Sequence, residues 1–470
     1  MRLLLGTAVE RVIAFRDRIR DARVTPAISA ADIRAHLSER YGDFTEPWAE
    51  GELVDGVSWM FESWQVQVGH PRYFGLFNPP TRPAAVAADL LVAGFNPQLA
   101  AWSHSPAANE IERHTLRYLA GRLGLDPDGT AATFTTAGAE ANQSALLAAL
   151  NHAYPDYRDR GLSGARELPV IYVSSESHHS IEKAAMTSGL GRRAVRTVAV
   201  DERLRMNVSD LRAAIREDRR RGRKPLMVVG TAGTTGGGIV DPLDELAALC
   251  AHERLWFHVD AAWGGAACLS PRLASAVAGI ERADSVTWDA HKWLCVPMGA
   301  GMFFCKHPEA VRRAFAVATP YMPPDINDTT DPYTWTIQWS RRHIGLKVFM
   351  SLAALGEAGT RAAIERQADM GDLLRRELGS RGWRIVNETR LPVVCFTRPE
   401  IDRGDVAAAQ IASRIEERFW ISPVRLGGRD PVLRACVTSY ETNEADITAL
   451  AEAVTSAVRS ENPGARQDHH

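Results

Sequence analysis

A lysine, Lys292, lies just after a predicted strand at Ser285–Thr287, within the motif DAHKW. Ligands of α/β proteins bind in the crevice at the carboxyl ends of the strands. A lysine that is partly withdrawn from water at such a place can attack a carbonyl carbon as a free amine. A surface lysine is the alternative interpretation when this stretch is taken alone.

A carboxylate holds the same position after another predicted strand. Asp260 follows Trp256–Val259 and precedes small residues, in the motif HVDAAWGG. A carboxylate there can bind a protonated ring nitrogen, and this ion pair makes a pyridine ring a better electron sink. An aspartate that caps the next helix is the alternative. One helix and one return strand fit between Asp260 and Lys292, so both are expected at one edge of a sheet.

A third motif, TFTTAGAEANQ, runs from a predicted strand into a helix. Its residues Thr136, Ala137 and Gly138 are expected to form a phosphate cradle, because backbone N–H groups at a helix start bind anions. A helix start without a ligand is the alternative.

Two further candidates follow predicted strands. His178 or His179 comes after Val170–Val173, where an imidazole can stack on a flat ring, and a capping histidine is the alternative. Thr234 or Thr235 lies in the turn GTAGTTGGG and can face a ring substituent. A simple turn explains that motif equally well, and Thr235 is the candidate that we retain.

The elements that must position these residues alternate along the chain. The predicted strands are Ala132–Phe134, Val170–Val173, Ala194–Val200, Leu226–Val229, Trp256–Val259, Ser285–Thr287 and Gly301–Cys305. Helical runs are predicted at Asn109–Leu123, Ala139–Ala153, Asp210–Arg221 and Leu243–His252. This alternation predicts an α/β fold with a mainly parallel sheet. Residues 306–340 are rich in Pro, Asp and Thr and are predicted to be irregular.

Composition excludes several classes of partner. The formal net charge is −2, so no strong field attracts nucleic acid or an anionic membrane. Six scattered cysteines form no CxxC pair and no His/Cys cluster at metal spacing, which predicts free thiols and no metal. The leucine run near the N-terminus is too short for a signal peptide or a membrane span. A cytoplasmic enzyme is therefore expected.

The order of the motifs resembles that of fold-type I (aspartate-aminotransferase-like) pyridoxal-phosphate enzymes. Within them the chain resembles the group II amino-acid decarboxylases, which act on aromatic amino acids, glutamate or diaminobutyrate. HVDAAWGG and DAHKW carry the resemblance, and HPRYF, the pair Ser105–Pro106 and SRRHIGLKVF support it over residues 70–440. It implies a pyridoxal 5'-phosphate-dependent decarboxylase, a lyase of amino-acid metabolism.

The resemblance also implies roles for single residues. Lys292 matches the Schiff-base lysine, Asp260 the partner of the ring nitrogen, His178 the ring-stacking histidine and Ala262 the small residue beneath the ring. Ala137, Gly138 and His291 match positions near the phosphate.

The chain departs from the family at two of these positions. Asp289 stands where aromatic-amino-acid decarboxylases usually carry Asn, and its role stays open because an acid repels a phosphate. Ala137 stands where some members have Ser, so a phosphate hydrogen bond is either lost or supplied by Thr136.

The family resemblance implies that the chain has three parts. They are residues 1–83 as an N-terminal helical arm and substrate loop, 84–345 as a large cofactor-binding domain, and 346–470 as a small C-terminal α+β domain. In the arm, Val9, Val12, Ile13 and Phe15 fall on one side of a helix. We interpret them as facing the core, and packing on a partner subunit is the alternative. The family implies a homodimer with active sites at the interface.

Protonation and specificity are the least determined features. The family uses a loop tyrosine of the partner subunit to deliver a proton; Tyr333 is preferred to Tyr321 here. Relatives with Phe at that position tend to be oxidative and yield aldehydes. The predicted pocket residues are Phe77, Gln98, Ala100 and Trp102. They favour an aromatic L-amino acid and leave a polar, acidic or diamino acid open.

Two rival interpretations remain at this stage. An aminotransferase would need an arginine for the substrate carboxylate in the C-terminal part, and Arg425 and Arg434 are available. A non-catalytic homologue would be expected to lack Lys292 or Asp260, and both are present.

Overall fold

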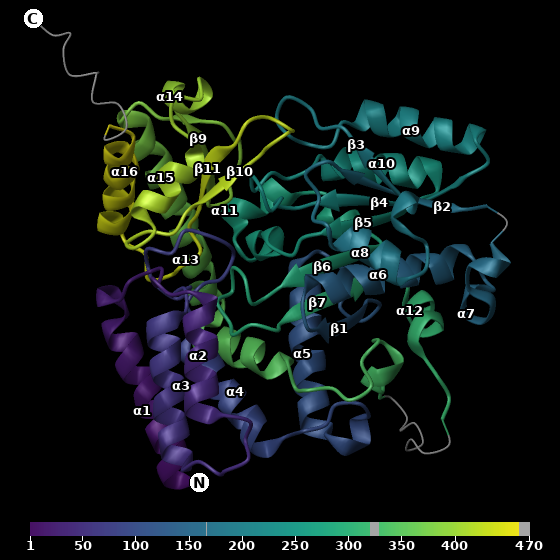
Figure 1. Cartoon of the computed structure of the whole chain (residues 1–470). Coiled ribbons are helices and arrows are strands. Elements are labelled where there is room, and N and C mark those ends of the chain that lie inside the picture. The colour runs from purple at the N-terminus through teal and green to yellow at the C-terminus, as the bar shows by residue number, and fades with distance from the viewer. Residues whose placement is uncertain (166, 320–328, 460–470) are drawn as a thin grey trace, which may run out of the picture.

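A computed structural model describes residues 1–165, 167–319 and 329–459 of the chain. Its main feature is a seven-stranded sheet with the order β1-β7-β6-β5-β4-β2-β3 (Figure 1). Five adjacent strands run parallel to one another: β6, β5, β4, β2 and β3. Strand β7 is antiparallel to both of its neighbours, β1 and β6. The predicted α/β fold with a mainly parallel sheet is therefore confirmed.

The strands agree with the predicted ones to within about two residues at each end. They are β1 (Ala131–Thr135), β2 (Pro169–Ser174), β3 (Val195–Val198), β4 (Lys224–Thr231), β5 (Trp256–Asp260), β6 (Ser285–Asp289) and β7 (Gly301–Cys305).

Helices cover both faces of this sheet. One face packs against α6 (Gly138–Ala153), α8 (Ser180–Thr187) and α12 (Pro308–Phe315), and the other against α5 (Pro106–Arg122), α9 (Val208–Arg220) and α10 (Leu243–Glu253). Along β4, Met227 and Val229 enter the first core and Val228 enters the second. Since alternate residues of a strand face opposite sides, two buried faces require this continuous apolar run.

The N-terminal helices lie apart from both cores. Helices α1 (Arg2–Arg18), α2 (Ala30–Tyr41) and α3 (Glu50–Trp64) stand together in Figure 1 and contain no buried residue. Val9, Val12 and Ile13 are all exposed, so the interpretation of this stripe as core-facing was wrong for the single chain. Among the described helices, none is both long and apolar enough to cross a membrane.

A second, antiparallel sheet forms near the C-terminus. It has the order β10-β11-β9-β8, with β8 (Arg384–Ile385), β9 (Val393–Thr397), β10 (Ser422–Val424) and β11 (Val432–Cys436). Helices α15 (Ala408–Ile415) and α16 (Glu444–Arg459) cover it.

One long helix, α13 (Gly345–Ser380), connects the two sheets. Its first half packs on α4 (Pro83–Phe95) and α5, and its second half enters the core of the C-terminal sheet through Met370 and Leu374. Gly356 interrupts it with a left-handed conformation, φ 63° and ψ 178°.

The described residues of the stretch 306–340, which are 306–319 and 329–340, are more regular than predicted. The stretch contains α12, which begins with Pro308 after His307 and buries Ala310 and Val311 against α6. A proline suits the first turn of a helix, where its missing N–H group has no partner to lose. Tyr321 lies outside the described residues.

Candidate active site

Three neighbouring parallel strands end side by side. Thr231 of β4 pairs with Asp260 of β5, and Asp260 pairs with Thr287 of β6. Strand β6 continues to Asp289, and Lys292 lies in the turn that follows. The expected meeting of Asp260 and the DAHKW motif at one sheet edge is thus present in the structure.

Lys292 is paired with a buried acid. Its Nζ lies 3.1 Å from Oδ2 of Asp289, whose side chain is 2% exposed. Nε2 of His291 lies 3.7 Å from the same oxygen, and Nδ1 of His291 accepts a hydrogen bond from the Ala300 N–H at 3.2 Å. Burial lowers the pKa of His291, which favours its neutral form with the proton on Nε2. The other oxygen of Asp289, Oδ1, has no hydrogen-bond partner among the described residues.

Asp260 is held from two sides. Its Oδ1 accepts from the N–H of Ala262 at 3.1 Å, and its Oδ2 accepts from Nδ2 of Asn142 at 2.9 Å. An ionised carboxylate offers about four lone-pair sites, so the carboxylate retains capacity for another donor such as a ring N–H.

Sequence analysis did not identify Asn142 or the polar residues around it. Asn142 on α6 also donates to Ser180, and its oxygen accepts from Thr287 and faces His258. The available signal was an amide in an otherwise apolar helix, four residues after Gly138. Helical periodicity alone could not tell that this amide faces the end of β5.

The two adjacent histidines differ in their surroundings. Nδ1 of His178 accepts from the N–H of Ser180 at 3.1 Å. Burial of this ring lowers the pKa of His178, the charge of Asp260 opposes that shift, and the charge of Lys292 adds to it. His178 therefore lies within electrostatic range of both residues. His179 is 92% exposed and faces Glu182 at 3.7 Å.

The start of α6 faces Asp289. A Cβ added to Gly138 would lie 3.0 Å from Oδ2 of Asp289 and 3.3 Å from Cβ of Ala262, so a residue with a side chain would crowd this point. Ala137, in extended conformation, precedes the helix. The N–H and hydroxyl of Thr136 both donate to Oε2 of Glu140, at 2.8 and 2.7 Å. The donors of Thr136 are thus already engaged within the chain.

The turn after β4 packs against the C-terminal sheet. The hydroxyl of buried Thr234 accepts from the N–H of Ile239 at 3.1 Å, within the turn itself. Thr235 is half-buried beside it. Asn387 and Thr389 donate to the carbonyl oxygens of Gly237 and Gly238 and hold the turn in place.

An aromatic wall adjoins Lys292. The ring centroid of Phe77 lies 5.8 Å from Nζ of Lys292 and 4.2 Å from the ring of Trp263, which it stacks against. Trp263 in turn stacks on Trp293 at 4.8 Å. On the same Phe77 ring, the guanidinium carbon of Arg434 lies 5.0 Å from the centroid.

Arg434 has unused donors. Its side chain is only 2% exposed, and its Nη1 donates to the carbonyl of Gly75 at 2.9 Å. Its Nε and Nη2 have no hydrogen-bond partner among the described residues. Because a buried charged group without partners is costly, these nitrogens are suited to an anion.

The other predicted pocket residues, together with Tyr333, are linked by hydrogen bonds to one another and to Asp331 and Arg341. Oε1 of Gln98 accepts from the N–H groups of Ala100 and Arg341, at 3.2 and 2.9 Å. The N–H of Tyr333 donates to the carbonyl of Ala100 at 3.1 Å, and the N–H of Trp102 donates to Asp331 at 2.7 Å. Gln98, Ala100, Trp102 and Tyr333 thus form one group, joined by hydrogen bonds that involve neither Lys292 nor Asp260.

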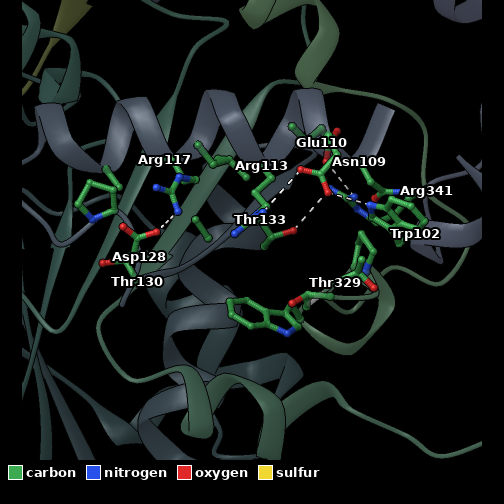
Figure 2. A pocket seen from close by; sticks show the side chains of 18 residues that line it. Trp102, Asn109, Glu110, Arg113, Arg117, Asp128, Thr130, Thr133, Thr329 and Arg341 are labelled. Atoms are coloured by element: carbon green, nitrogen blue, oxygen red, sulfur yellow. Dashed lines mark hydrogen bonds and ion pairs between the residues drawn. The ribbon is translucent and has the colours of Figure 1, made fainter. Parts of the chain in front are cut away.

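Figure 2 shows the pocket beside this group, which measures about 220 Å³. Trp102, Arg341 and residues of α5 and β1 line it, and Lys292 and Asp260 do not. Its arginines are matched by acids: Arg117 pairs with Asp128, and Arg341 lies 3.0 Å from Glu112. Arg113 likewise lies 3.6 Å from Glu110, so each arginine among the described lining residues has an acidic partner.

Comparisons with known proteins agree with this geometry. A family model described as the pyridoxal-dependent decarboxylase conserved domain matches residues 56–398. The crystal structure of mouse CSAD in apo form has a TM-score of 0.89 at 26% identity and covers 97% of this chain and 98% of that one. The fold and site thus define a fold-type I pyridoxal-phosphate enzyme.

Curated relatives narrow the class. The chain is 31% identical to the aromatic-L-amino-acid decarboxylase of Bacillus atrophaeus over 401 residues, 84% of this chain and 81% of that protein. It is 32% identical to the acidic amino acid decarboxylase GADL1 of Mus musculus, over 70% of this chain and 60% of that protein. It is 35% identical to the L-2,4-diaminobutyrate decarboxylase of Rhizobium meliloti (strain 1021), over 63% and 58%. For the last two, the match spans less than two thirds of the relative's length.

The chain belongs to the pyridoxal-dependent decarboxylase family and is a pyridoxal-phosphate-dependent amino-acid decarboxylase. The residues at the sheet edge fit this cofactor. Lys292 offers an amine at the sheet edge, Asp260 a buried carboxylate with spare lone pairs, and the start of α6 a compact helix terminus of the kind that can bind a phosphate. The feature that fits least is the acid Asp289 facing that helix start.

Proposed function

We propose that the chain decarboxylates an aromatic L-amino acid to its amine and carbon dioxide. The observation that carries this proposal is the ring of Phe77, 5.8 Å from Nζ of Lys292 and continued by the stacked ring of Trp263. Such a wall offers an aromatic side chain offset-stacked or edge-to-face contacts, each worth about 0.5–1.5 kcal/mol beyond area burial.

Each residue at the sheet edge receives a proposed role. Bound pyridoxal phosphate supplies the electron sink for the electrons that the leaving carbon dioxide releases. Lys292 binds the cofactor covalently and Asp260 accepts the ring N–H, while His178 and Ala262 pack on the two faces of the ring. The main-chain N–H groups at Ala137 and Gly138 hold the phosphate.

The remaining predicted cofactor residues adjoin this set. We propose that His291 donates from Nε2 toward the phosphate, which is consistent with its neutral form and its position beside Asp289. Thr235 is proposed to contact a ring substituent from the turn after β4. Thr136 reaches the phosphate only if it exchanges its bonds with Glu140.

We propose a homodimer that completes the site. Helices α1, α3 and α4 carry exposed apolar side chains: Leu3, Leu5, Val9, Val12, Ile13, Val57, Trp59, Phe61, Val86, Leu90, Leu91 and Phe95. Exposed apolar side chains in this number support an interaction site. A second copy would cover it and bring Tyr333 and Trp102 of one subunit to Lys292 of the other. Light scattering would test this, and a monomer at micromolar concentration would contradict it.

An acidic amino acid is the second candidate substrate, favoured by Arg434. Its Nε and Nη2 are buried, unpartnered among the described residues and close to Phe77. A guanidinium on the leaving carboxylate would stabilise the ground state more than the transition state, because charge moves away from that group. Arg434 is therefore better suited to a second, side-chain carboxylate than to the departing one.

A substrate panel decides between the two candidates. Release of carbon dioxide would be measured from L-tryptophan, L-tyrosine, L-phenylalanine, L-aspartate, L-glutamate and L-2,4-diaminobutyrate, with each product identified. An aromatic substrate predicts that Phe77→Leu raises its KM about tenfold. An acidic substrate predicts that Arg434→Lys does so instead, because a bidentate pair is lost. Arg425→Lys, at an exposed arginine, is the matched control.

Product analysis separates related reactions. With Tyr333 as proton donor, amine and carbon dioxide should form in equal amounts. Aldehyde would indicate oxidative decarboxylation, and a keto acid without carbon dioxide would indicate transamination.

We place the protein in the cytoplasm as a further proposal. It is supported by six free and buried cysteines at Cys250, Cys268, Cys295, Cys305, Cys395 and Cys436. Free thiols are typical of a reducing compartment. Cell fractionation tests the location, and recovery from outside the cytoplasm would contradict it.

A further inference from the structure

Asn142 uses the whole hydrogen-bonding capacity of its amide at the sheet edge. It is 1% exposed and lies on α6, four residues after Gly138. Its Nδ2 donates to Oδ2 of Asp260 at 2.9 Å and to Oγ of Ser180 at 2.8 Å. Its Oδ1 accepts from Thr287 at 2.7 Å and faces Nε2 of His258 at 3.0 Å. An amide has two donors and two acceptor sites, and all four are used here.

The direction of each bond in this network follows from Asp260. Its carboxylate accepts, so the Nδ2 of Asn142 faces it and the Oδ1 of Asn142 faces His258. An amide oxygen can only accept, so His258 carries its proton on Nε2 and donates it to Asn142. Nδ1 of His258 then accepts from the hydroxyl of Ser285 at 2.8 Å. That hydroxyl in turn accepts from the indole Nε1 of Trp256, also at 2.8 Å.

The network stays in this arrangement at neutral pH. Burial lowers the pKa of His258 to about 4, so the ring is neutral and keeps one proton. Trp256, Ser285, His258, Thr287 and Ser180 thus act together as a support that fixes the orientation of Asn142. Fully satisfied buried networks of this kind restrict side-chain motion.

We propose that Asn142 is a positioning residue that aims the Asp260 carboxylate at the nitrogen of the cofactor ring. One Asn142 N–H group occupies a lone pair of Oδ2, and the N–H of Ala262 occupies a lone pair of Oδ1. Together they prevent the carboxylate from turning and leave its remaining lone pairs for the ring N–H. Asn142 acts only through Asp260 and does not touch the ring itself. The inference rests on the proposed role of Asp260.

The decisive experiment compares cofactor binding and ring protonation in variants of the full-length holoenzyme. The variants are Asn142→Leu, which removes all four bonds, and Asn142→Asp, which keeps the shape. Asn151→Leu is the matched control, because this asparagine lies buried on the same helix and, among the described residues, its Nδ2 donates only to the Leu147 carbonyl. Affinity is read from the Schiff-base absorption band. Ring protonation is read from the nitrogen-15 NMR shift of pyridoxal phosphate labelled at its ring nitrogen.

Asn142→Leu is expected to weaken pyridoxal phosphate binding about tenfold or more, because hydrogen bonds to charged groups contribute at this level. Its nitrogen-15 shift should move toward that of the unprotonated ring, and Asn151→Leu should match the wild type in both. A wild-type affinity and shift in Asn142→Leu would overturn the proposal. These readouts need no substrate, so they stand apart from the identity of the amino acid.

Asn142→Asp provides the second test if Asn142→Leu fails to fold. At low pH the introduced carboxyl group is protonated and can still donate to Asp260, and at high pH it becomes a second carboxylate that repels it. The affinity for pyridoxal phosphate should therefore fall with rising pH in this variant more steeply than in the wild type. Equal pH dependence would overturn the proposal. If Asp260→Asn also leaves the nitrogen-15 shift unchanged, the role of Asp260 fails instead.

Discussion

At the carboxyl edge of the large sheet, the amide of Asn142 finds all of its partners within this chain, whereas helices α1, α2 and α3 bury none of their residues. The first region is organised by the fold of a single chain. The second exposes apolar side chains that water solvates poorly. With the homodimer proposed above, we expect cofactor binding to depend on one chain and full activity to depend on two.

The largest expected effect falls in the region that one chain completes. Lys292→Ala should abolish the Schiff-base absorption band and lower kcat by roughly 10³-fold or more, because it removes the amine proposed to bind the cofactor. Lys347→Ala is the control, since this buried lysine pairs with Asp89 instead. A wild-type band in Lys292→Ala would mean that another lysine binds the cofactor.

The next effect tests the region that lacks a partner. Ile13→Asp should raise the dimer dissociation constant at least about tenfold, because it places a charge on the apolar surface of α1. Pyridoxal phosphate should still bind, while activity falls with the dimer fraction. Light scattering and activity would be measured on the same dilution series. Leu168→Asp, at another exposed apolar residue, should change neither; a dimeric and fully active Ile13→Asp would refute the comparison.

Acid stability examines the buried network itself. The pKa of His258 is about 4 in the folded chain, below its ordinary value of 6.5, because burial disfavours the charged ring. As pH falls below 6.5 the unfolded chain takes up this proton first, so the folded state loses about 2–3 kcal/mol by pH 4. His258→Asn should lose less stability between pH 7 and pH 5 than the wild type, measured by denaturant unfolding.

A second buried group also makes stability depend on pH. Burial raises the pKa of Asp241 to about 6, so the folded chain gains stability from this group as pH falls through 6. Asp241 is present in both the wild type and His258→Asn, so its contribution cancels when their stabilities are compared. His104→Asn, at an exposed histidine, should behave like the wild type. Parallel pH profiles for His258→Asn and wild type would show that the ring titrates normally.

The smallest effect concerns the one unsatisfied oxygen of Asp289. If Lys292 binds the cofactor as proposed, this acid loses its charged partner and its carboxylate faces the helix start proposed for the phosphate. Asp289→Asn should tighten pyridoxal phosphate binding about three- to tenfold by removing this repulsion. Asp284→Asn, at a carboxylate near the opposite end of β6, is the control. Weaker binding in Asp289→Asn would show that the acid assists the phosphate.

The sequence predicted the parts of the site that follow strands. The ends of β4, β5 and β6 were recognisable because short apolar runs stop at polar residues, and parallel strands end at one edge. The buried support of Asp260 was missed, because the periodicity of α6 does not reveal which of its polar residues faces a strand. The apolar stripe of α1 was assigned to the core for a similar reason. An apolar stripe predicts that a helix face packs against something, but the sequence does not tell whether that is the core of the same chain or a second subunit.

Gly356 places a bend at one residue of α13, the helix that connects the two sheets. A Cβ there would meet no atom within 4 Å, so a side chain would be opposed by backbone torsion and not by packing. The core beneath the large sheet extends into the C-terminal sheet through Leu391, Val393 and Cys395, so the sheet that carries Arg434 cannot change its angle without repacking these residues. A substitution that straightened α13 at Gly356 would therefore disturb the packing of both sheets, and this glycine limits how far descendants of this chain could vary the angle between them.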